Sequence, residues 1–328
     1  MNLKYNLGQF YSKNADYILE GMEVPSDVPL IEPFVGEGDL VKWANRSMES
    51  YDINPKVSAI TQDTLLNPPE YKDKFVITNP PYLARNKNKD KSVYDHYGLN
   101  DLYKIAIQTM IDGDVSGGIL IVPLNFICSP RYKLRKSFLE KYTIERLNIF
   151  EEDVFSDTSY TVCSFKFSKQ TFPVSTSIDT LIYPTGENIE LSLHRDNNYT
   201  IGLELFPTLK TEYRIRRLVE GETPNSDLYL RAIDSGSNSG RISLSVNKNH
   251  LYGSQTDRTF ATIQTDKKID DEDYVRDRFN VILETYREEY NSLFLTNYRN
   301  STLHYARKRI AFTQAYSLIE QIVKENDG

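Results

Sequence analysis

The sequence is poor in the residues that build metal centres and disulfide frameworks. Its 328 residues include only two cysteines, four histidines and one tryptophan. Both cysteines, Cys128 and Cys163, stand among apolar residues, so the composition excludes a disulfide scaffold and a cysteine-rich zinc site and suits a reducing compartment. The histidines are scattered without metal-ligand spacing, and we therefore predict that the protein holds no metal.

Long apolar runs and an excess of positive charge are missing as well. No segment approaches the ~18 consecutive apolar residues that a transmembrane helix requires. The first residues lead into no apolar core of the kind found in secretory signals. These absences predict a cytoplasmic protein that makes no membrane contact. The net charge of −7 argues against non-specific nucleic-acid binding, although it leaves local basic patches open.

The pattern of apolar residues divides the chain in two. Strands are expected near residues 30–35, 75–78, 119–122, 144–150 and 160–167, and helices over 39–48, 101–111 and 131–141. Strands that alternate with helices form a largely parallel sheet with helices on both faces, so residues 1–170 are predicted to be a Rossmann-like α/β domain. Residues 171–328 are predicted to be a second domain of mixed type, β-rich to about residue 265 and helical after it.

The sharpest motif is Asn79-Pro80-Pro81-Tyr82, directly after the buried strand 75–78. Ligands of α/β sheets bind at the carboxyl ends of the strands, where this motif is expected to lie. The side-chain oxygen of Asn79 and the carbonyl of Pro80 can accept the two hydrogens of a conjugated amine such as that of adenine. The prolines hold these acceptors rigid, and Tyr82 offers a flat face for stacking on a base. The alternative is an ordinary strand-ending turn.

A second motif, Glu32 to Leu40, contains Gly36 and Gly38 after a predicted strand. Such glycines permit a tight turn and a close approach of the backbone to a ligand. The acidic residues around them suit a cationic ligand better than a pyrophosphate. Asp52, where the second strand should end, can accept from ribose hydroxyls, and Asp63 from an adenine amino group. Taken singly, each of these motifs is also explained by an ordinary loop.

The order of these motifs resembles that of the S-adenosylmethionine-dependent N6-adenine DNA methyltransferases of the gamma class, over roughly residues 8–168. In that class the cofactor motifs precede the catalytic motif and target recognition is C-terminal. The resemblance implies cofactor contacts from Gln9, Tyr11, Glu32, Phe34, Gly36, Gly38, Asp52, Ile53, Asp63 and Asn79. It implies a catalytic site made of Asn79, Pro80, Pro81, Tyr82 and Phe155, in which Phe155 and Tyr82 sandwich a flipped adenine.

The resemblance also implies partners: S-adenosylmethionine, double-stranded DNA and, as a candidate, a cognate restriction endonuclease, with the protein a monomer or weak dimer in a bacterial, archaeal or viral host cell. Residues 83–98 are interpreted as a long polar loop beside the base pocket. The candidate DNA contacts come from this loop and from the C-terminal half: Arg85, Lys87, Lys89, Arg214, Arg216, Arg217, Arg299, Arg307, Lys308 and Arg309.

Several alternatives stay open at this point. The four-residue motif also occurs in enzymes that methylate RNA or cytosine N4, and in protein-glutamine methyltransferases, which the large C-terminal half disfavours. A non-catalytic DNA-binding partner of a restriction-modification assembly is a further alternative. Basic groups are often solvated helix faces, and Phe155 is also explained as a buried aromatic.

Overall fold

The computed structural model describes residues 12, 14–155, 158, 160–170, 175–206, 212–235, 240–254, 257–300 and 306–327. Gln9 and Tyr11, two of the expected cofactor contacts, lie outside these residues. The chain forms two compact units, which are described separately. Unit 1 consists of residues 1–126 and 131–199, and unit 2 of residues 127–130 and 200–328.

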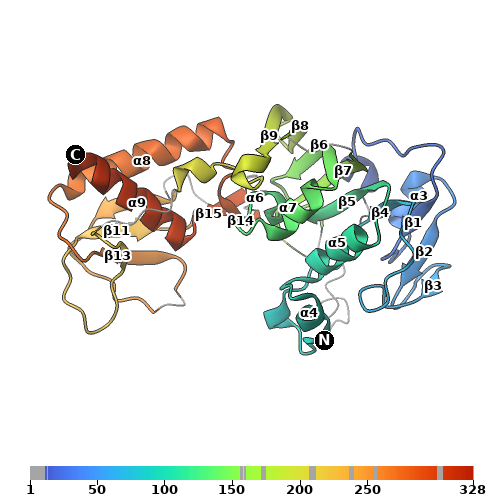
Figure 1. Cartoon of the computed structure of the whole chain (residues 1–328), viewed down its shortest axis with the longest axis horizontal. Coiled ribbons are helices and arrows are strands. Elements are labelled where there is room, and N and C mark those ends of the chain that lie inside the picture. Colours follow the sequence, from blue (N-terminus) through green and yellow to red (C-terminus); the bar gives the residue numbers. More distant parts are fainter. Residues whose placement is uncertain are drawn as a thin grey trace. The chain divides into compact units, whose positions relative to one another are not determined.

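Unit 1 is built on a nine-stranded sheet of order β3-β2-β1-β4-β5-β7-β6-β8-β9 (Figure 1). Its strands are β1 Leu30–Glu32, β2 Glu49–Asp52, β3 Ile60–Thr61, β4 Phe75–Thr78, β5 Gly117–Pro123, β6 Tyr142–Phe150, β7 Val162–Lys169, β8 Ser175–Tyr183 and β9 Glu187–His194. Strands β3 to β5 pair in parallel, β7 runs antiparallel between β5 and β6, and β8 is again parallel to β6. The predicted α/β class with a mostly parallel sheet is confirmed.

The helices of unit 1 follow the predicted alternation with one difference. They are α2 Ala15–Ile18, α3 Asp39–Ala44, α4 Ser92–Tyr97, α5 Leu102–Asp112 and α7 Lys133–Leu139. Two short 3₁₀ turns, η1 Arg85–Lys87 and η2 Arg195–Asn197, also belong to unit 1. Helix α6 Asn125–Cys128 has its first two residues in unit 1 and its last two in unit 2. Helices α5 and α7 lie on the same face of the sheet (Figure 1). The segment 83–98, expected to be a loop, contains η1 and α4 because a bridge between Ala84 and Asp101 closes its base.

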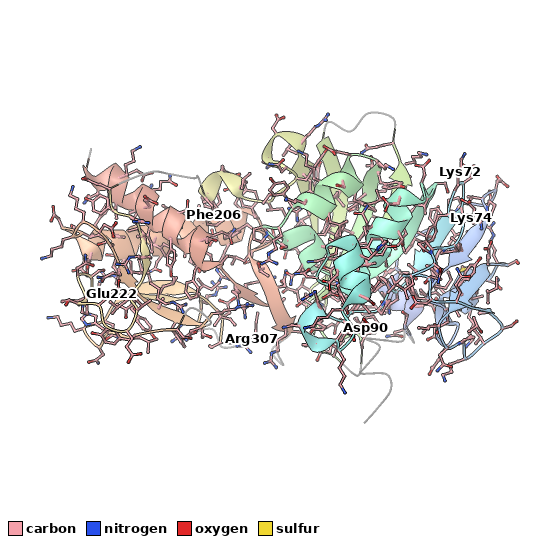
Figure 2. The ribbon with its side chains drawn as sticks, turned by 60° about the horizontal axis from the view of Figure 1, so that its bottom comes forward. Lys72, Lys74, Asp90, Phe206, Glu222 and Arg307 are labelled. Carbon is pink, nitrogen blue, oxygen red and sulfur yellow. The ribbon has the colours of Figure 1, made fainter. Side chains whose placement is uncertain are left out.

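The middle strands β4 and β5 form the core of unit 1, and glycine sets their spacing. A Cβ atom on Gly118 would lie 2.6 Å from the carbonyl oxygen of Val76, closer than real Cβ contacts allow. This close pairing places Thr78 opposite Leu120, so the chain just after β4 lies beside Ile121. At the opposite edge of the sheet, the ammonium of Lys74 bonds Glu49 Oε2 at 2.6 Å, next to the exposed Lys72 (Figure 2).

The division between the units falls at Tyr199, whereas the sequence pattern placed a boundary near residue 170. The difference arises from β8 and β9, which extend the sheet. Strand β8 pairs in parallel with β6, and β9 pairs antiparallel with β8. The β-prone composition after residue 170 therefore adds strands to the first sheet before the second unit begins.

Unit 2 combines an antiparallel sheet, a hairpin and two helices. Its sheet has the order β10-β13-β11-β12, formed by β10 Arg216–Arg217, β11 Leu228–Arg231, β12 Ser243–Val246 and β13 Phe260–Gln264. The turn η3 Leu203–Leu205 precedes it, and α8 Glu272–Glu289 and α9 Phe312–Asp327 follow it. The hairpin of β14 Thr296–Asn300 and β15 Ala306–Arg309 interrupts a stretch that was expected to be helical. In the described part of the chain, no helix has the length and apolar character needed to cross a membrane.

Candidate functional site

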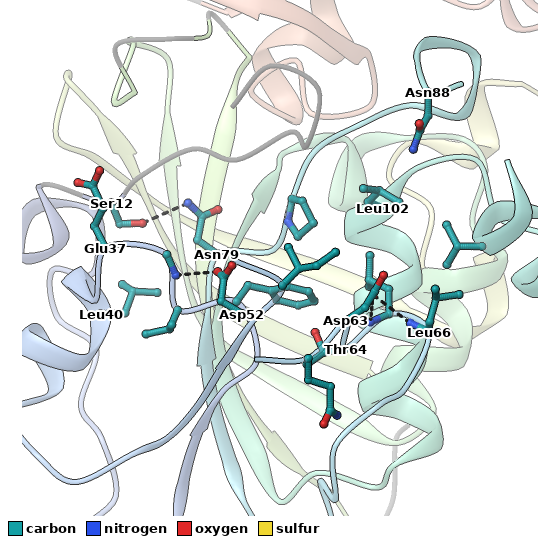
Figure 3. A pocket seen from close by; sticks show the side chains of 18 of the residues that line it. Ser12, Glu37, Leu40, Asp52, Asp63, Thr64, Leu66, Asn79, Asn88 and Leu102 are labelled. Carbon is teal, nitrogen blue, oxygen red and sulfur yellow. Dashed lines mark hydrogen bonds between the residues drawn. The ribbon is translucent and has the colours of Figure 1, made fainter. Parts of the chain in front are cut away.

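A cavity of about 310 Å³ lies in unit 1 at the carboxyl ends of β1, β2 and β4 (Figure 3). Residues that the sequence assigned to the cofactor line it: Phe34, Gly36, Asp52, Ile53, Asp63 and Asn79, together with Pro81 of the catalytic motif. The topology explains this gathering, because parallel neighbouring strands end at the same edge of the sheet.

The turn after β1 is held in place by Asp52. Gly36 and Gly38 have φ values of 52° and 79°, a left-handed backbone that favours glycine. The backbone N–H of Gly36 donates to Asp52 Oδ2 at 3.0 Å, and that of Asn54 donates to Asp52 Oδ1 at 2.7 Å (Figure 3). The buried carboxylate therefore fixes the glycine turn, and each of its oxygens keeps a lone pair for a further donor.

Glu32, at the end of β1, is buried beneath this turn with only 1% of its surface exposed. Its Oε1 accepts hydrogen bonds from the backbone N–H of Phe34 at 3.0 Å and from the hydroxyl of Thr78. Its Oε2 has no hydrogen-bond partner among the described residues. Burial raises the pKa of Glu32 to about 8, against an ordinary value of 4.5. A positive group brought to this oxygen would favour the charged form of the carboxyl.

The far part of the cavity is more apolar. Ile53 and Leu66 leave 48% and 55% of their surfaces exposed although both are large aliphatic residues, and both line the cavity. Asp63 lies beside them, and its Oδ1 accepts from the backbone N–H groups of Leu65 and Leu66 at 3.1 and 3.2 Å (Figure 3). These exposed aliphatic side chains offer contact surface to a flat apolar ring, with a carboxylate at its edge.

Asn79 follows β4 directly and is held from two sides. Its Nδ2 donates to the hydroxyl of Ser12 at 3.1 Å, and its Oδ1 accepts from the hydroxyl of Tyr82 at 2.5 Å. The Tyr82 oxygen also lies 2.7 Å from the carbonyl oxygen of Ile121 in β5. Burial raises the pKa of Tyr82 well above its ordinary value, so the hydroxyl stays protonated and remains a donor.

The structure brings Tyr82 and Phe155 together, as the resemblance implied. Their ring centroids are 6.5 Å apart with the planes tilted by 60°, and Tyr103 meets Tyr82 edge to face at 6.2 Å. A base stacked between two parallel rings needs a centroid separation of about 7 Å. The observed arrangement therefore fits stacking on one ring with an edge contact from the other better than a parallel sandwich.

Sequence reasoning missed several residues of this site. Thr78 and Ser12 position Glu32 and Asn79 through their hydroxyls, but a single hydroxyl residue beside a motif carries no sequence signal. The segment around α4 was assigned to DNA alone, yet Asn88, Asp90, Ser92 and Val93 form part of the cavity wall. The bridge at Ala84 that folds this segment back depends on contacts distant in sequence.

The expected DNA contacts have different surroundings. The guanidinium of Arg85 is paired with Asp95 at 2.7 Å, whereas Lys87 and Lys89 are exposed. In unit 2, Arg214 and Arg299 are exposed and Arg309 is half-buried, while Arg216 pairs with Glu222 at 2.6 Å. The side chains of Lys87, Lys89, Arg214 and Arg299 are thus the accessible ones.

Two of the expected DNA contacts are internal instead. Arg217 is 8% exposed, donates to the carbonyl oxygens of Ser254 and Asp257, and covers the ring of Phe312 at 4.4 Å. Lys308 is 4% exposed, and its ammonium donates to Asn297 Oδ1 at 2.8 Å. These side chains hold unit 2 together and are not among the DNA contacts proposed below.

A neighbouring residue of the same hairpin, Arg307, is also engaged. Its Nε donates to the backbone carbonyl of Asp234 at 2.9 Å. Asp234 is itself buried, with its Oδ1 bonded to Arg287 at 2.9 Å. Among the described residues of both units, no group of three or more His, Cys, Asp or Glu side chains could hold a metal ion.

The sheet of unit 1 is mostly parallel with a reversed β7, and its cavity lies beyond the glycine turn. Residues 38–155 match the family model of the Eco57I restriction-modification methylase. Over these residues the chain is similar to restriction-modification methylases, which agrees with the resemblance stated from the motifs. No curated protein matches the chain significantly.

Solved structures similar to this chain include a modification subunit of a putative type I restriction enzyme from Vibrio vulnificus, with 12% identity, a TM-score of 0.44, and 55% of this chain and 48% of that chain covered. The methyltransferase subunit of a type I system from Streptococcus thermophilus has 15% identity and a TM-score of 0.38, with 54% and 47% covered. A putative class I methyltransferase from Listeria monocytogenes has 14% identity and a TM-score of 0.38, with 51% and 61% covered. The chain spans about half of the length of the first two of these proteins.

Proposed function

We propose that this protein is a DNA adenine-N6 methyltransferase that uses S-adenosylmethionine and acts on an adenine turned out of the duplex. The observation that supports the proposal best is the position of Asn79. It follows β4, lines the cavity, and has a side chain held by Ser12 and Tyr82. A methyl acceptor at Asn79 would therefore meet a donor bound in the same cavity.

The donors and acceptors of the cavity fit this cofactor. When bound, S-adenosylmethionine supplies a methyl group attached to positively charged sulfur. Glu32 does not line the cavity but is buried beside its glycine turn; its Oε2 has no hydrogen-bond partner among the described residues and suits a cationic group such as the ammonium of the methionine part. The remaining lone pairs of Asp52 suit ribose hydroxyls, and the exposed aliphatic surfaces of Ile53 and Leu66 suit the adenine ring.

The chemistry of the catalytic motif follows from two acceptors. Asn79 Oδ1, which accepts from the Tyr82 hydroxyl, is one acceptor, and the Pro80 carbonyl is the other. Together they can hold both hydrogens of an exocyclic amine, which favours a tetrahedral nitrogen whose lone pair is free to attack. An amide is no base at neutral pH, so the proton leaves during or after methyl transfer. Tyr82 stacks on the base while Phe155 contacts its edge.

We assign the reading of the DNA sequence to unit 2 and catalysis to unit 1. Exposed basic side chains, Lys89 in unit 1 and Arg214 and Arg299 in unit 2, are the proposed contacts to the DNA backbone. We propose a monomer or weak dimer, with a cognate restriction endonuclease as a candidate partner, because the matched family combines modification with restriction.

The proposal is tested by methyl transfer from labelled S-adenosylmethionine to unmethylated duplex DNA and to RNA, with the modified nucleoside identified by mass spectrometry. N6-methyladenine in DNA is the expected product. N4-methylcytosine, or a product in RNA alone, would replace the proposed substrate by one of the alternatives. Cofactor binding without any product would replace it by a non-catalytic partner.

The substitution Asp52→Asn should weaken cofactor binding by about tenfold or more. Each carboxylate oxygen of Asp52 accepts one backbone N–H, from Gly36 or from Asn54. In asparagine an NH₂ group replaces one of these oxygens, so it would face one of the two N–H groups and that hydrogen bond would be lost. Isothermal titration calorimetry with S-adenosylhomocysteine measures the effect, with the exposed Asp27→Asn as a matched control. An affinity equal to that of the control would remove Asp52 from the cofactor site.

A further inference from the structure

Lys87 and Tyr160 meet at the edge of the sheet where Asn79 lies. The ammonium of Lys87 donates to the hydroxyl oxygen of Tyr160 at 3.1 Å and lies 5.7 Å from the centroid of its ring. Tyr160 is unusual among the described aromatic residues of unit 1 because 37% of its surface is exposed. An exposed cation and an exposed hydroxyl are thus held together by two different parts of the chain.

The two residues belong to the segments that carry the aromatic rings of the catalytic site. Lys87 is five residues after Tyr82, and Tyr160 is five residues after Phe155. Five residues of chain reach at most about 18 Å. Strand β7 begins at Val162, opposite Pro123 at the carboxyl end of β5, so Tyr160 lies near the same end of the sheet as Asn79. The pair therefore joins the two segments that flank the base pocket.

The half-buried Asp101 lies close to the segment that joins Tyr82 to Lys87. Burial raises the pKa of its carboxyl to about 6, and the positive charge of Lys87 opposes that rise. The same carboxylate contributes to the raised pKa of Tyr82. Both Lys87 and Tyr82 thus lie within electrostatic reach of one side chain. The backbone of Asp101 bridges Ala84, which lies between them in sequence.

The pair offers donors and a positive charge rather than a stacking face. Lys87 has three N–H groups, of which the bond to Tyr160 uses one, and the Tyr160 hydroxyl keeps its own hydrogen. No carboxylate of the described residues lies within ion-pair distance of Lys87, whereas the nearby Arg85 is paired with Asp95. The ammonium lies at the hydroxyl end of the Tyr160 ring, 3.1 Å from the oxygen and 5.7 Å from the centroid. The Lys87 ammonium and the Tyr160 hydroxyl can donate to two oxygens of one phosphate group, and the positive charge of Lys87 favours such an anion.

We propose that Lys87 and Tyr160 together bind a phosphate of the target strand next to the adenine that enters the pocket. This inference rests on the proposed function, and it adds Tyr160 as a DNA contact and gives Lys87 a defined ligand group. Because both donors sit on segments that carry the pocket rings, their contact would fix the target nucleotide relative to Tyr82 without touching the reacting atoms.

The test measures binding of a short fluorescein-labelled duplex with one mismatched adenine, over a range of salt concentrations and with sinefungin present. An unpaired adenine lowers the cost of leaving the stack. Lys87→Gln should weaken binding about tenfold and reduce the slope of log K against log salt by about 0.9, the value for one phosphate contact. Tyr160→Phe should weaken binding about threefold and leave that slope unchanged, because it removes one hydrogen bond and no charge.

The matched control is Lys72→Gln. It removes the same charge from an exposed lysine that precedes β4, at the opposite edge of the sheet (Figure 2). Cofactor binding should be unchanged in all three variants, which shows that they fold. If Lys87→Gln matches Lys72→Gln in affinity and in slope, the inference is wrong.

The methylation assay separates this inference from the proposed function. If the parent protein methylates DNA and the slope does not depend on Lys87, the inference fails and the function stands. If the parent protein gives no product while the Lys87 effect on the slope is present, the phosphate contact stands and the enzymatic proposal fails.

Discussion

Asn79→Ala should lower the rate of methyl transfer by at least about a hundredfold, the loss typical for one polar group aimed at a developing charge. The variant removes the acceptor that holds one amine hydrogen. Affinity for S-adenosylmethionine should change by less than about threefold, because Asp52 and the glycine turn are held by bonds that do not involve Asn79. Single-turnover methylation and calorimetry measure the two quantities separately.

The control for this variant is Asn188→Ala, an exposed asparagine on the outer strand β9 of the same sheet. It should methylate at the parent rate. If Asn79→Ala loses cofactor affinity and turnover by the same factor, Asn79 acts in cofactor binding, and its assignment to the methyl acceptor is wrong.

Glu32→Gln should stabilise the ligand-free protein at neutral and alkaline pH while weakening cofactor binding. The glutamine oxygen can keep both bonds to the Phe34 N–H and the Thr78 hydroxyl. The variant replaces the buried, unpartnered Oε2 by an amide nitrogen, so the side chain can no longer ionise. An uncompensated buried charge is costly in the folded state, and a cationic ligand compensates it.

The pH dependence follows from the raised pKa of about 8 for folded Glu32, against 4.5 for the unfolded chain. Below pH 4.5 the carboxyl is protonated in both states and contributes no difference. Between the two values only the unfolded chain ionises, so the parent protein loses stability as the pH rises, and the loss is complete above about pH 8. Glu32→Gln lacks this loss and should be more stable by about 3 kcal/mol at pH 7.

Urea denaturation at a series of pH values measures this difference, with the exposed Glu23→Gln as a control. Cofactor affinity of the parent should rise with pH toward about 8, because binding of a cationic group selects the ionised carboxylate. Glu32→Gln should bind the cofactor about tenfold more weakly and without this pH dependence. A stability difference that is constant from pH 5 to pH 9 would contradict the assigned protonation state.

The sequence predicted those parts of the site that depend on neighbouring residues. The apolar run 75–78 gave strand β4 with its observed bounds, and the motif directly after it had to lie where that strand ends. Gly36 and Asp52 were predicted for the same reason, since Gly36 follows β1 and Asp52 ends β2, two parallel neighbours in the sheet. The bond between them shows that these two predictions describe one local structure.

The remaining features depend on contacts between distant segments. The polar composition of residues 83–98 indicated a loop, but the bridge between Ala84 and Asp101 and the pairing of Arg85 with Asp95 fold it into η1 and α4. In the same way, a basic triplet in the sequence does not show that Lys308 points inward to Asn297. Burial of a charged side chain depends on the partners that the fold supplies.

The Tyr82 hydroxyl has a consequence for how this site is switched. It has one hydrogen and two acceptors within reach, Asn79 Oδ1 at 2.5 Å and the Ile121 carbonyl at 2.7 Å. A turn of this one O–H bond toward Ile121 breaks the bond to Asn79 Oδ1, and a turn back restores it. In the proposed reaction, the Ile121 carbonyl of β5 therefore competes with Asn79 Oδ1 for the hydroxyl hydrogen of Tyr82. The alignment of β4 with β5, which Gly118 makes possible, sets the position of this carbonyl relative to the proposed methyl acceptor.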